Sequence, residues 1–98
     1  MKLLYFYMKG CKTCKQQDNE FNKHKPMNVD IVKLDVDDVD TIRLCKKLHI
    51  GDAPTMVLMK DYDSTMNREI IDKNFVKKWI DLTKTEEIER EITKHIKI

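Results

Sequence analysis

Glycine and proline are scarce in this 98-residue sequence, with two of each, and no apolar run reaches the length of a membrane span. A spanning helix needs about 18 consecutive apolar residues, so we expect no membrane partner. We also find no internal repeat, no low-complexity segment and no linker. A chain of this length supports one hydrophobic core and not two. The sequence therefore predicts a single soluble domain.

An excess of charge of one sign is also missing. The 19 basic and 17 acidic residues are mixed along the chain and give a formal charge of +2. Proteins that track phosphate backbones carry a basic block, so we expect no nucleic-acid partner. The N-terminal apolar run ends at Lys9 without the small-residue cleavage site of a secretory signal. We therefore expect a cytoplasmic protein whose first element is a strand.

Cysteine is infrequent, and the count of three is odd. An odd number fits no closed disulfide framework, and a persistent structural disulfide is not expected in a reducing cytosol. Cys11 and Cys14 lie in the stretch "GCKTCK". The Cys-x-x-Cys spacing alone serves both disulfide chemistry and zinc binding. These cysteines therefore indicate either catalytic or metal-binding sulfur, and their context must decide.

The first half of the sequence predicts a βαβ unit. Residues 3–8 form a continuous apolar run, the pattern of a strand buried on both faces, which we place in the centre of a sheet. After Gly10, apolar residues recur at helical spacing, and this helix must end before Pro26. Residues 29–35 are rich in valine and isoleucine and predict a second strand. Cys11 would then lie at the N-terminus of the first helix.

A second helix, of about ten residues, should follow. One face of it carries the apolar residues of its sequence, namely Val39, Ile42, Cys45 and Leu48. On this face Cys45 is expected to be a small buried hydrophobic residue. The segment "GDAPT" ends the helix.

Residues 55–59 predict a third strand, and a shorter strand near 68–71 is close enough to pair with it as an antiparallel hairpin. An amphipathic helix is predicted next, on the residues Phe75, Val76, Trp79 and Ile80. The predicted order is βαβαββα, within a domain of residues 1–82.

The remaining stretch, 83–98, predicts a helical tail. Thr83 and Glu86 have the spacing of a capping box. Isoleucines spaced four apart would align on one face of this helix: Ile88, Ile92 and Ile96. Three isoleucines bury too little surface for a stable interface, which needs about 800 Å² per partner. We therefore expect the tail to be a C-terminal helical extension packed on the same domain, and the protein to be a monomer.

A strand, a turn and Cys-x-x-Cys at a helix start form the context in which this motif is a redox pair. The unpaired N–H groups and the positive end of the helix dipole favour the thiolate form of Cys11. Three nearby lysines add positive potential: Lys9, Lys12 and Lys15. Cys14, one turn further along the helix, faces the same side with its sulfur less exposed. We therefore expect Cys11 to be the nucleophile and Cys14 the resolving thiol.

Three motifs together resemble the thioredoxin superfamily: "GCKTCK" after the first strand, "VKLDVD" in the second and "APT" at the start of the third. The resemblance extends from the N-terminus to about Thr83. It implies an α/β thioredoxin-like fold, with a central mixed sheet of about four strands flanked by helices. It also implies that Pro54 is cis and faces the redox pair, and that Ala53 presents its backbone to a substrate chain.

The resemblance further implies the activity, that of a thiol-disulfide oxidoreductase acting in cell redox homeostasis. Such a protein reduces protein disulfides, is regenerated by a reductase, and needs no cofactor beyond its own Cys11–Cys14 disulfide. Besides Ala53 and Pro54, the substrate-binding residues would be those next to the cysteines: Gly10, Lys12 and Thr13.

Several positions depart from the family pattern. Gly10 stands where thioredoxins carry a tryptophan, and Lys12 and Thr13 replace a Gly-Pro pair. Tyr5 occupies the position of a buried aspartate, and Lys33 matches that aspartate's lysine partner, so we expect Lys33 to have lost its mate. The chain is similar in size to glutaredoxins, but it has "IIDKNF" where a glutathione-binding Gly-Gly pair would follow the last strand. Glutathione is therefore not the expected dedicated partner.

The alternative interpretation is a non-enzymatic module, either zinc-binding or redox-inactive. Cys11, Cys14, Cys45 and His49 supply the ligand types of a Cys₃His zinc site. The obstacle is topology, because the second helix of a βαβ unit need not converge on the first motif.

Overall fold

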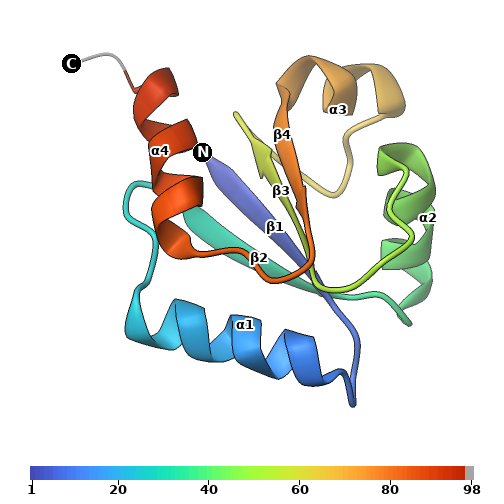
Figure 1. Ribbon diagram of the computed structural model, residues 1–98. Coiled ribbons are helices and arrows are strands. Elements are labelled where there is room, and N and C mark those ends of the chain that lie inside the picture. Colours follow the sequence, from blue (N-terminus) through green and yellow to red (C-terminus); the bar gives the residue numbers. More distant parts are fainter. Residues whose placement is uncertain (97–98) are drawn as a thin grey trace.

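The computed structural model describes residues 1–96, in which four strands and four helices alternate along the chain (Figure 1). The elements are β1 (Lys2–Tyr7), α1 (Lys12–Lys23), β2 (Asp30–Asp35), α2 (Val39–Leu48), β3 (Thr55–Met59), α3 (Arg68–Asn74), β4 (Phe75–Ile80) and α4 (Thr85–His95). The last two residues of the predicted tail, 97–98, lie outside the described residues. Within residues 1–96, none of the helices has both the length and the apolar character needed to cross a bilayer.

The four strands form one mixed sheet in the order β2-β1-β3-β4. β1 pairs in parallel with β2 and antiparallel with β3, and β3 pairs antiparallel with β4. The central position of β1 explains its continuous apolar sequence, because both of its faces are covered. The predicted mixed four-stranded sheet of a thioredoxin-like fold is confirmed.

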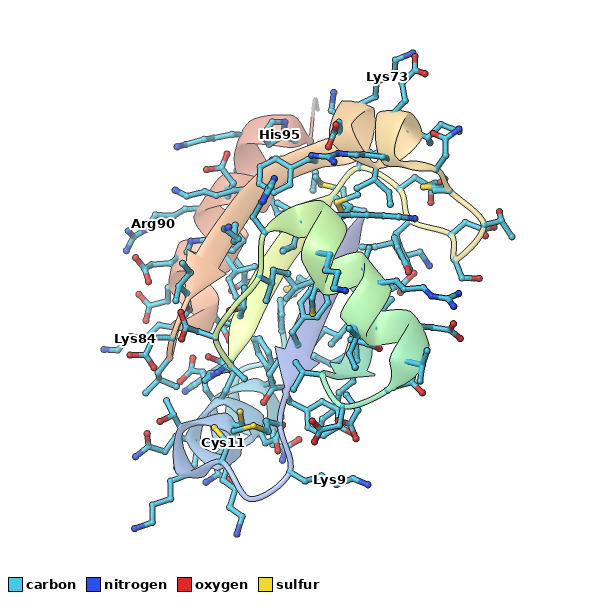
Figure 2. The ribbon with its side chains drawn as sticks, turned by 90° about the vertical axis from the view of Figure 1, so that its right-hand side faces the viewer. Lys9, Cys11, Lys73, Lys84, Arg90 and His95 are labelled. Carbon is cyan, nitrogen blue, oxygen red and sulfur yellow. The ribbon has the colours of Figure 1, made fainter. Side chains whose placement is uncertain are left out.

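Helices cover both faces of the sheet, with α1 and α4 on one side and α2 and α3 on the other (Figure 1). Successive side chains of a strand point to opposite faces, so β1 contributes to two cores. Leu3 and Tyr5 pack in one core with Phe21 of α1, whereas Leu4 and Phe6 pack in the other with residues of α2 and α3. Cys11 lies at the end of the molecule opposite Lys73 of α3 (Figure 2).

The helix α2 has the predicted length, but it is turned relative to the predicted apolar face. Its buried residues include Leu44 and Leu48, which lie one turn apart and pack against the sheet. Val39 and Ile42 are exposed to 64% and 42%, and Cys45 is only partly buried. Of the four residues of the predicted face, only Leu48 is buried, so hydrophobic spacing predicted this face in part.

The assignments for residues 68–80 were wrong. The stretch "REII" begins helix α3, where the Asn67 side chain caps the helix by accepting a hydrogen bond from the Ile70 N–H at 3.0 Å. Phe75–Ile80, predicted as a helix, is the edge strand β4. An edge strand with one partner and half-exposed faces has a sequence much like that of an amphipathic helix, and pairing with β3 decides between them. The observed order is therefore βαβαβαβα, and β3 pairs antiparallel with β4 and with β1, not with residues 68–71.

The predicted C-terminal helix is present as α4, and it is joined to α1 by buried polar contacts. The Gln17 side-chain amide exchanges two hydrogen bonds with the backbone of Thr83, at 2.9 and 2.8 Å. The predicted capping box does not form, because the Thr83 hydroxyl donates to the Asp81 carbonyl instead. The Glu20 carboxylate caps α4 by accepting a hydrogen bond from the Thr85 N–H at 2.9 Å. Sequence spacing could not reveal a cap that comes from another helix.

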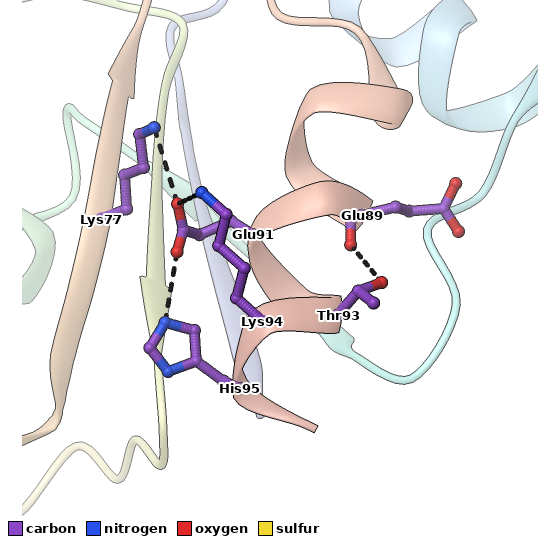
Figure 3. Close-up of polar contacts among 6 residues, drawn as sticks. All are labelled: Lys77, Glu89, Glu91, Thr93, Lys94 and His95. Carbon is purple, nitrogen blue, oxygen red and sulfur yellow. Dashed lines mark hydrogen bonds and ion pairs between the residues drawn. The ribbon is translucent and has the colours of Figure 1, made fainter. Parts of the chain in front are cut away.

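The packing of α4 buries two of its three isoleucines, and a charge cluster fixes its far end. Ile88 and Ile92 are 0% and 2% exposed and belong to the core on the α1 side, whereas Ile96 is exposed to 36%. Near that end, the Glu91 carboxylate meets Lys77 of β4 at 3.6 Å (Figure 3). It also contacts Lys94 and His95 of its own helix, at 3.8 and 3.2 Å. Helix α4 is thus packed on the same face of the sheet as α1.

Candidate redox site

The two cysteines lie where the central strand turns into the first helix. β1 ends at Tyr7, and the turn that follows includes Gly10 with a φ of +78°, a conformation that glycine adopts without the steric cost of a side chain. Cys11 is the N-cap residue of α1, in an extended conformation. Figure 2 shows Cys11 at the start of α1, with Lys9 extending from the turn beside it. The structure therefore places Cys11 at the helix N-terminus, as the sequence predicted.

Two polar contacts hold the Cys11 sulfur. The backbone N–H of Cys14 donates a hydrogen bond to Sγ of Cys11 at 3.2 Å, the capping contact of α1. The Cys11 thiol in turn lies 3.9 Å from the Ala53 carbonyl oxygen, to which it can donate. The Cys11 sulfur therefore lies between a backbone N–H at the helix N-terminus and a backbone carbonyl.

The two sulfurs have different environments. Cys11 is partly exposed, whereas Cys14 is 3% exposed, and both are free thiols. Burial raises the pKa of Cys14 to about 11, and the contact with Cys11 and the charge of Asp18 add to the effect. Within this pair, Cys11 is therefore the sulfur that a large disulfide substrate can reach, and Cys14 is the protected one.

The loop before β3 forms the other wall of the site. The Ala53–Pro54 peptide bond is cis. Two hydrogen bonds anchor this loop: the Asp81 N–H donates to the Pro54 carbonyl at 2.8 Å, and the Thr55 hydroxyl donates to the Asp52 carbonyl at 2.7 Å. The start of β3 and the end of β4 thus hold the Ala53 carbonyl beside Cys11.

The predicted substrate-binding residues next to the cysteines are accessible. Gly10 and Lys12 are exposed, and Thr13 is partly buried in the first turn of α1. The structure therefore brings Gly10, Lys12, Thr13 and the Ala53–Pro54 loop to the same end of the sheet as the redox pair.

Lys33 has a partner, contrary to the prediction that it had lost its mate. Its ammonium group lies 3.2 Å from the Asp18 carboxylate of α1 and 4.5 Å from the centroid of the Tyr7 ring. Tyr5, in the adjacent strand, donates a hydrogen bond from its hydroxyl to the Cys14 carbonyl at 2.9 Å. The partner was missed because it comes from α1 and not from the strand position where the family pattern would place it.

An apolar groove of about 490 Å³ adjoins the redox site. Its apolar lining includes Met8, Ile42, Cys45, Ile50 and Ala53, and two charged residues, Lys46 and Asp52, also line it. Met8 and Ile42 are exposed to 44% and 42%, which is unusual for large apolar side chains near one another. This groove was not predicted from the sequence; the signal for it was the surplus of apolar residues on α2.

The ligand set of the zinc alternative does not assemble. Residues 1–96 contain no group of three or more histidine, cysteine, aspartate or glutamate side chains that could hold a metal ion. Cys45 lines the apolar groove, where burial raises the pKa of its thiol. His49 is the C-cap of α2, in the left-handed conformation with a φ of +55°.

Comparison with known proteins shows which family the chain resembles. The family model described as "Thioredoxin" matches residues 1–82. Thioredoxin-2 of the malaria parasite shares 22% identity and a TM-score of 0.70, and the alignment covers 96% of this chain and 82% of that one. A mutant thioredoxin of Halobacterium salinarum shares 18% identity and a TM-score of 0.71, and the alignment covers 99% of this chain and 75% of that one.

Mitochondrial thioredoxin 3 of Saccharomyces cerevisiae, in its oxidised form, shares 23% identity with a TM-score of 0.66, and 95% of this chain and 76% of that one are covered. Identities this low establish a common fold and no more. A search of curated proteins by sequence finds no match.

Proposed function

Because the chain belongs to the thioredoxin family, we propose that it is a thiol-disulfide oxidoreductase that reduces protein disulfides through Cys11 and Cys14. The observation that carries this proposal is the contact between the two cysteines. The accessible Cys11 sulfur lies at a helix N-terminus, 3.2 Å from the backbone nitrogen of Cys14, and the Cys14 sulfur is buried. Family membership supports a redox role in general, and the roles of the individual residues are our proposal.

The reaction runs through a mixed disulfide. The Cys11 thiolate attacks one sulfur of the substrate disulfide, so that a Cys11–substrate bond forms and the first substrate thiolate leaves. The Cys14 thiolate then attacks Sγ of Cys11, which forms the Cys11–Cys14 disulfide and releases the second substrate thiolate. The substrate gains two electrons and the protein loses two, which a reductase must return.

The loop beside the pair and the apolar groove would bind the substrate chain. An extended substrate can hydrogen-bond to the backbone of Ala53 while an apolar side chain near its cysteine enters the groove. Gly10, Lys12 and Thr13 form the rim on the α1 side. This arrangement favours a protein or peptide substrate over a small disulfide, since the groove lies beyond the reacting sulfurs.

We further propose that the protein works in the cytoplasm as a monomer, with protein disulfides as substrates and an unidentified reductase as electron donor. It would need no cofactor, nucleic acid or membrane. Burial of Ile88 and Ile92 in the domain itself supports the monomer, because these side chains are not free to form an interface.

Insulin reduction by dithiothreitol tests the proposed activity. Precipitation of the insulin B chain is followed for the wild type and for the Cys11→Ser, Cys14→Ser and Cys45→Ser variants. We expect Cys11→Ser to fall to the rate of dithiothreitol alone, and Cys45→Ser to retain turnover. Equal loss of activity in the Cys11 and Cys45 variants, or none in either, would refute the assignment.

A further inference from the structure

The proposed function leaves one step without a proton acceptor. Cys14 must lose its proton before it can attack Cys11, because the thiolate is the nucleophile. The Cys14 side chain is 3% exposed, and burial raises the pKa of its thiol to about 11. In the mixed disulfide Cys11 is bonded to the substrate, but burial still disfavours the charged form of Cys14. A base close to Cys14 would remove this obstacle.

Asp18 is the carboxylate in the right place. It lies four residues after Cys14 on α1, so the two side chains are neighbours on one face of the helix. The Asp18 charge also contributes to the raised pKa of Cys14, so the carboxylate interacts electrostatically with the thiol. Asp18 also lines a solvent-accessible hollow of about 410 Å³ together with Tyr5, Asn22 and Lys33. A proton received by Asp18 can therefore leave to solvent.

We propose that Asp18, held in place by Lys33, accepts the proton of the Cys14 thiol when the mixed disulfide is resolved. The proton passes from Sγ of Cys14 to the carboxylate, directly or through one water. The resulting thiolate attacks Sγ of Cys11, the bond from Cys11 to the substrate breaks, and the substrate thiolate leaves with the electron pair. The proton on Asp18 then goes to solvent, which restores the carboxylate.

Each group that faces Asp18 suits this role. Lys33 of β2 lies 3.2 Å from the carboxylate and keeps it oriented. Tyr5 of β1 already donates its hydroxyl proton to the Cys14 carbonyl. Burial, with the nearby Asp18 charge, raises the pKa of Tyr5, so this residue stays neutral and cannot be the base. Lys25, after α1, also lines the hollow and is a cation.

The Asp18–Lys33 pair is open to solvent. The Asp18 and Lys33 side chains are 36% and 48% exposed, so water can exchange protons with the carboxylate. Lys33 is restrained on its other side by the Tyr7 ring at 4.5 Å. The ion pair is thus the solvent-connected end of a path that begins at a buried thiol.

Reaction with Ellman's reagent separates the two chemical steps. Attack by Cys11 releases one thionitrobenzoate, at a rate proportional to reagent concentration. Resolution by Cys14 releases a second, at a rate independent of that concentration. All variants carry Cys45→Ala, so that the third thiol does not contribute. The experiment uses the full chain in stopped flow, from pH 6 to pH 9, with enough reagent that the first step is not limiting.

For Asp18→Asn, we expect the second phase to slow by about a hundredfold at pH 7, the lower part of the range for a lost general base. The first phase should stay within about twofold of the parent. In the parent, resolution should depend little on pH. In Asp18→Asn it should rise about tenfold per pH unit, because hydroxide must then generate the thiolate.

The control is Asp30→Asn. Asp30 pairs with Lys2 at the same distance of 3.2 Å, but it lies at the start of β2, away from the cysteines. It should change neither phase, and thermal unfolding checks that both variants are folded. An unchanged second phase in Asp18→Asn, or a slower one with an unaltered pH profile, would overturn the role of Asp18. Failure of the proposed function is a separate result: the parent itself would then show no second phase.

Discussion

The backbone N–H of Cys14 donates a hydrogen bond to Sγ of Cys11 across 3.2 Å. This contact is also the N-cap of α1, so one hydrogen bond both begins the helix and orients the reacting sulfur. The cap fixes the distance between the two residues before any substrate binds. The packing of α1 on the sheet and the contact of the Cys11 sulfur with the Ala53 carbonyl complete the site, so the geometry of the redox pair is a consequence of the fold.

The turn before the pair gives a first prediction. Gly10 has a φ of +78°, and a Cβ at this position would meet nothing within 4 Å. The cost of Gly10→Ala is therefore conformational alone, about 1–2 kcal/mol, and we expect a lower free energy of unfolding by that amount in urea titration. Gly10→Asn should cost less, because asparagine tolerates this region better.

Gly51 is the matched control for that change. It also has open space around its Cα, but its φ lies outside the strained positive range. Gly51→Ala should be neutral or stabilise by up to about 1 kcal/mol. Equal costs at Gly10 and Gly51 would show that the backbone at Gly10 is not the source of the effect.

The isoleucines of α4 provide a graded series. Ile88 is fully buried and Ile96 is 36% exposed. We expect Ile88→Ala to lower the free energy of unfolding by about 2–5 kcal/mol, since it leaves a cavity in the core, and Ile96→Ala to lower it by less than about 0.5 kcal/mol. Light scattering should give a monomer for the wild type. A dimer that Ile88→Ala converts to a folded monomer would contradict the packing described here.

The cap of α4 predicts a dependence of stability on pH. The hydrogen bond from the Thr85 N–H lowers the pKa of Glu20 in the folded state. A lowered pKa means that the carboxylate adds stability above its ordinary pKa, and that this contribution is lost as the pH falls through the lowered value. Glu20→Gln should therefore cost about 1 kcal/mol at pH 7, and the difference from the wild type should shrink toward pH 2.

Glu69→Gln is the control for Glu20→Gln. Glu69 pairs with Lys73 on the surface of α3, with its side chain 77% exposed. Urea titrations at both pH values should show almost no effect of this change. A Glu20→Gln cost that is the same at pH 2 and pH 7 would rule out a charged cap.

The groove gives a prediction about substrates. Ile42 lines it from α2, so Ile42→Glu should raise the KM for insulin by about tenfold, the effect of losing one apolar contact. The reaction of Cys11 with Ellman's reagent should be unchanged. Val39→Glu, on the same helix but outside the groove and 64% exposed, should affect neither. If both variants impaired insulin reduction equally, the added charge and not the groove would be responsible.

Secondary structure could be predicted from the sequence where the local residues alone determine the element. The run of residues 3–8 indicated a strand covered on both faces, and the position of Cys11 before a helix followed from Gly10 and the helical spacing after it. The stretch 68–80 failed because its elements depend on partners. "REII" is helical through the Asn67 cap, and Phe75–Ile80 is a strand because β3 offers it an edge.

Part of the site could also be predicted because its residues are close together in the sequence. Cys11 and Cys14 stand in one motif, and the link to Ala53 and Pro54 came from the resemblance. Asp18 was missed, since only the folded chain brings α1 next to Lys33 of β2. The groove was missed because Ile42 looked like a core residue, and its exposure depends on how α2 is turned on the sheet.

Mass analysis of a trapped intermediate tests the central claim most directly. The Cys14→Ser variant is incubated with a peptide disulfide, digested and mapped, with Cys11→Ser treated in parallel. Without a resolving thiol the mixed disulfide should persist, so we expect one adduct on Cys11 in Cys14→Ser, and little adduct on Cys45 in either variant. An adduct mainly on Cys45, or none on Cys11, would contradict the assignment of Cys11 as the nucleophile.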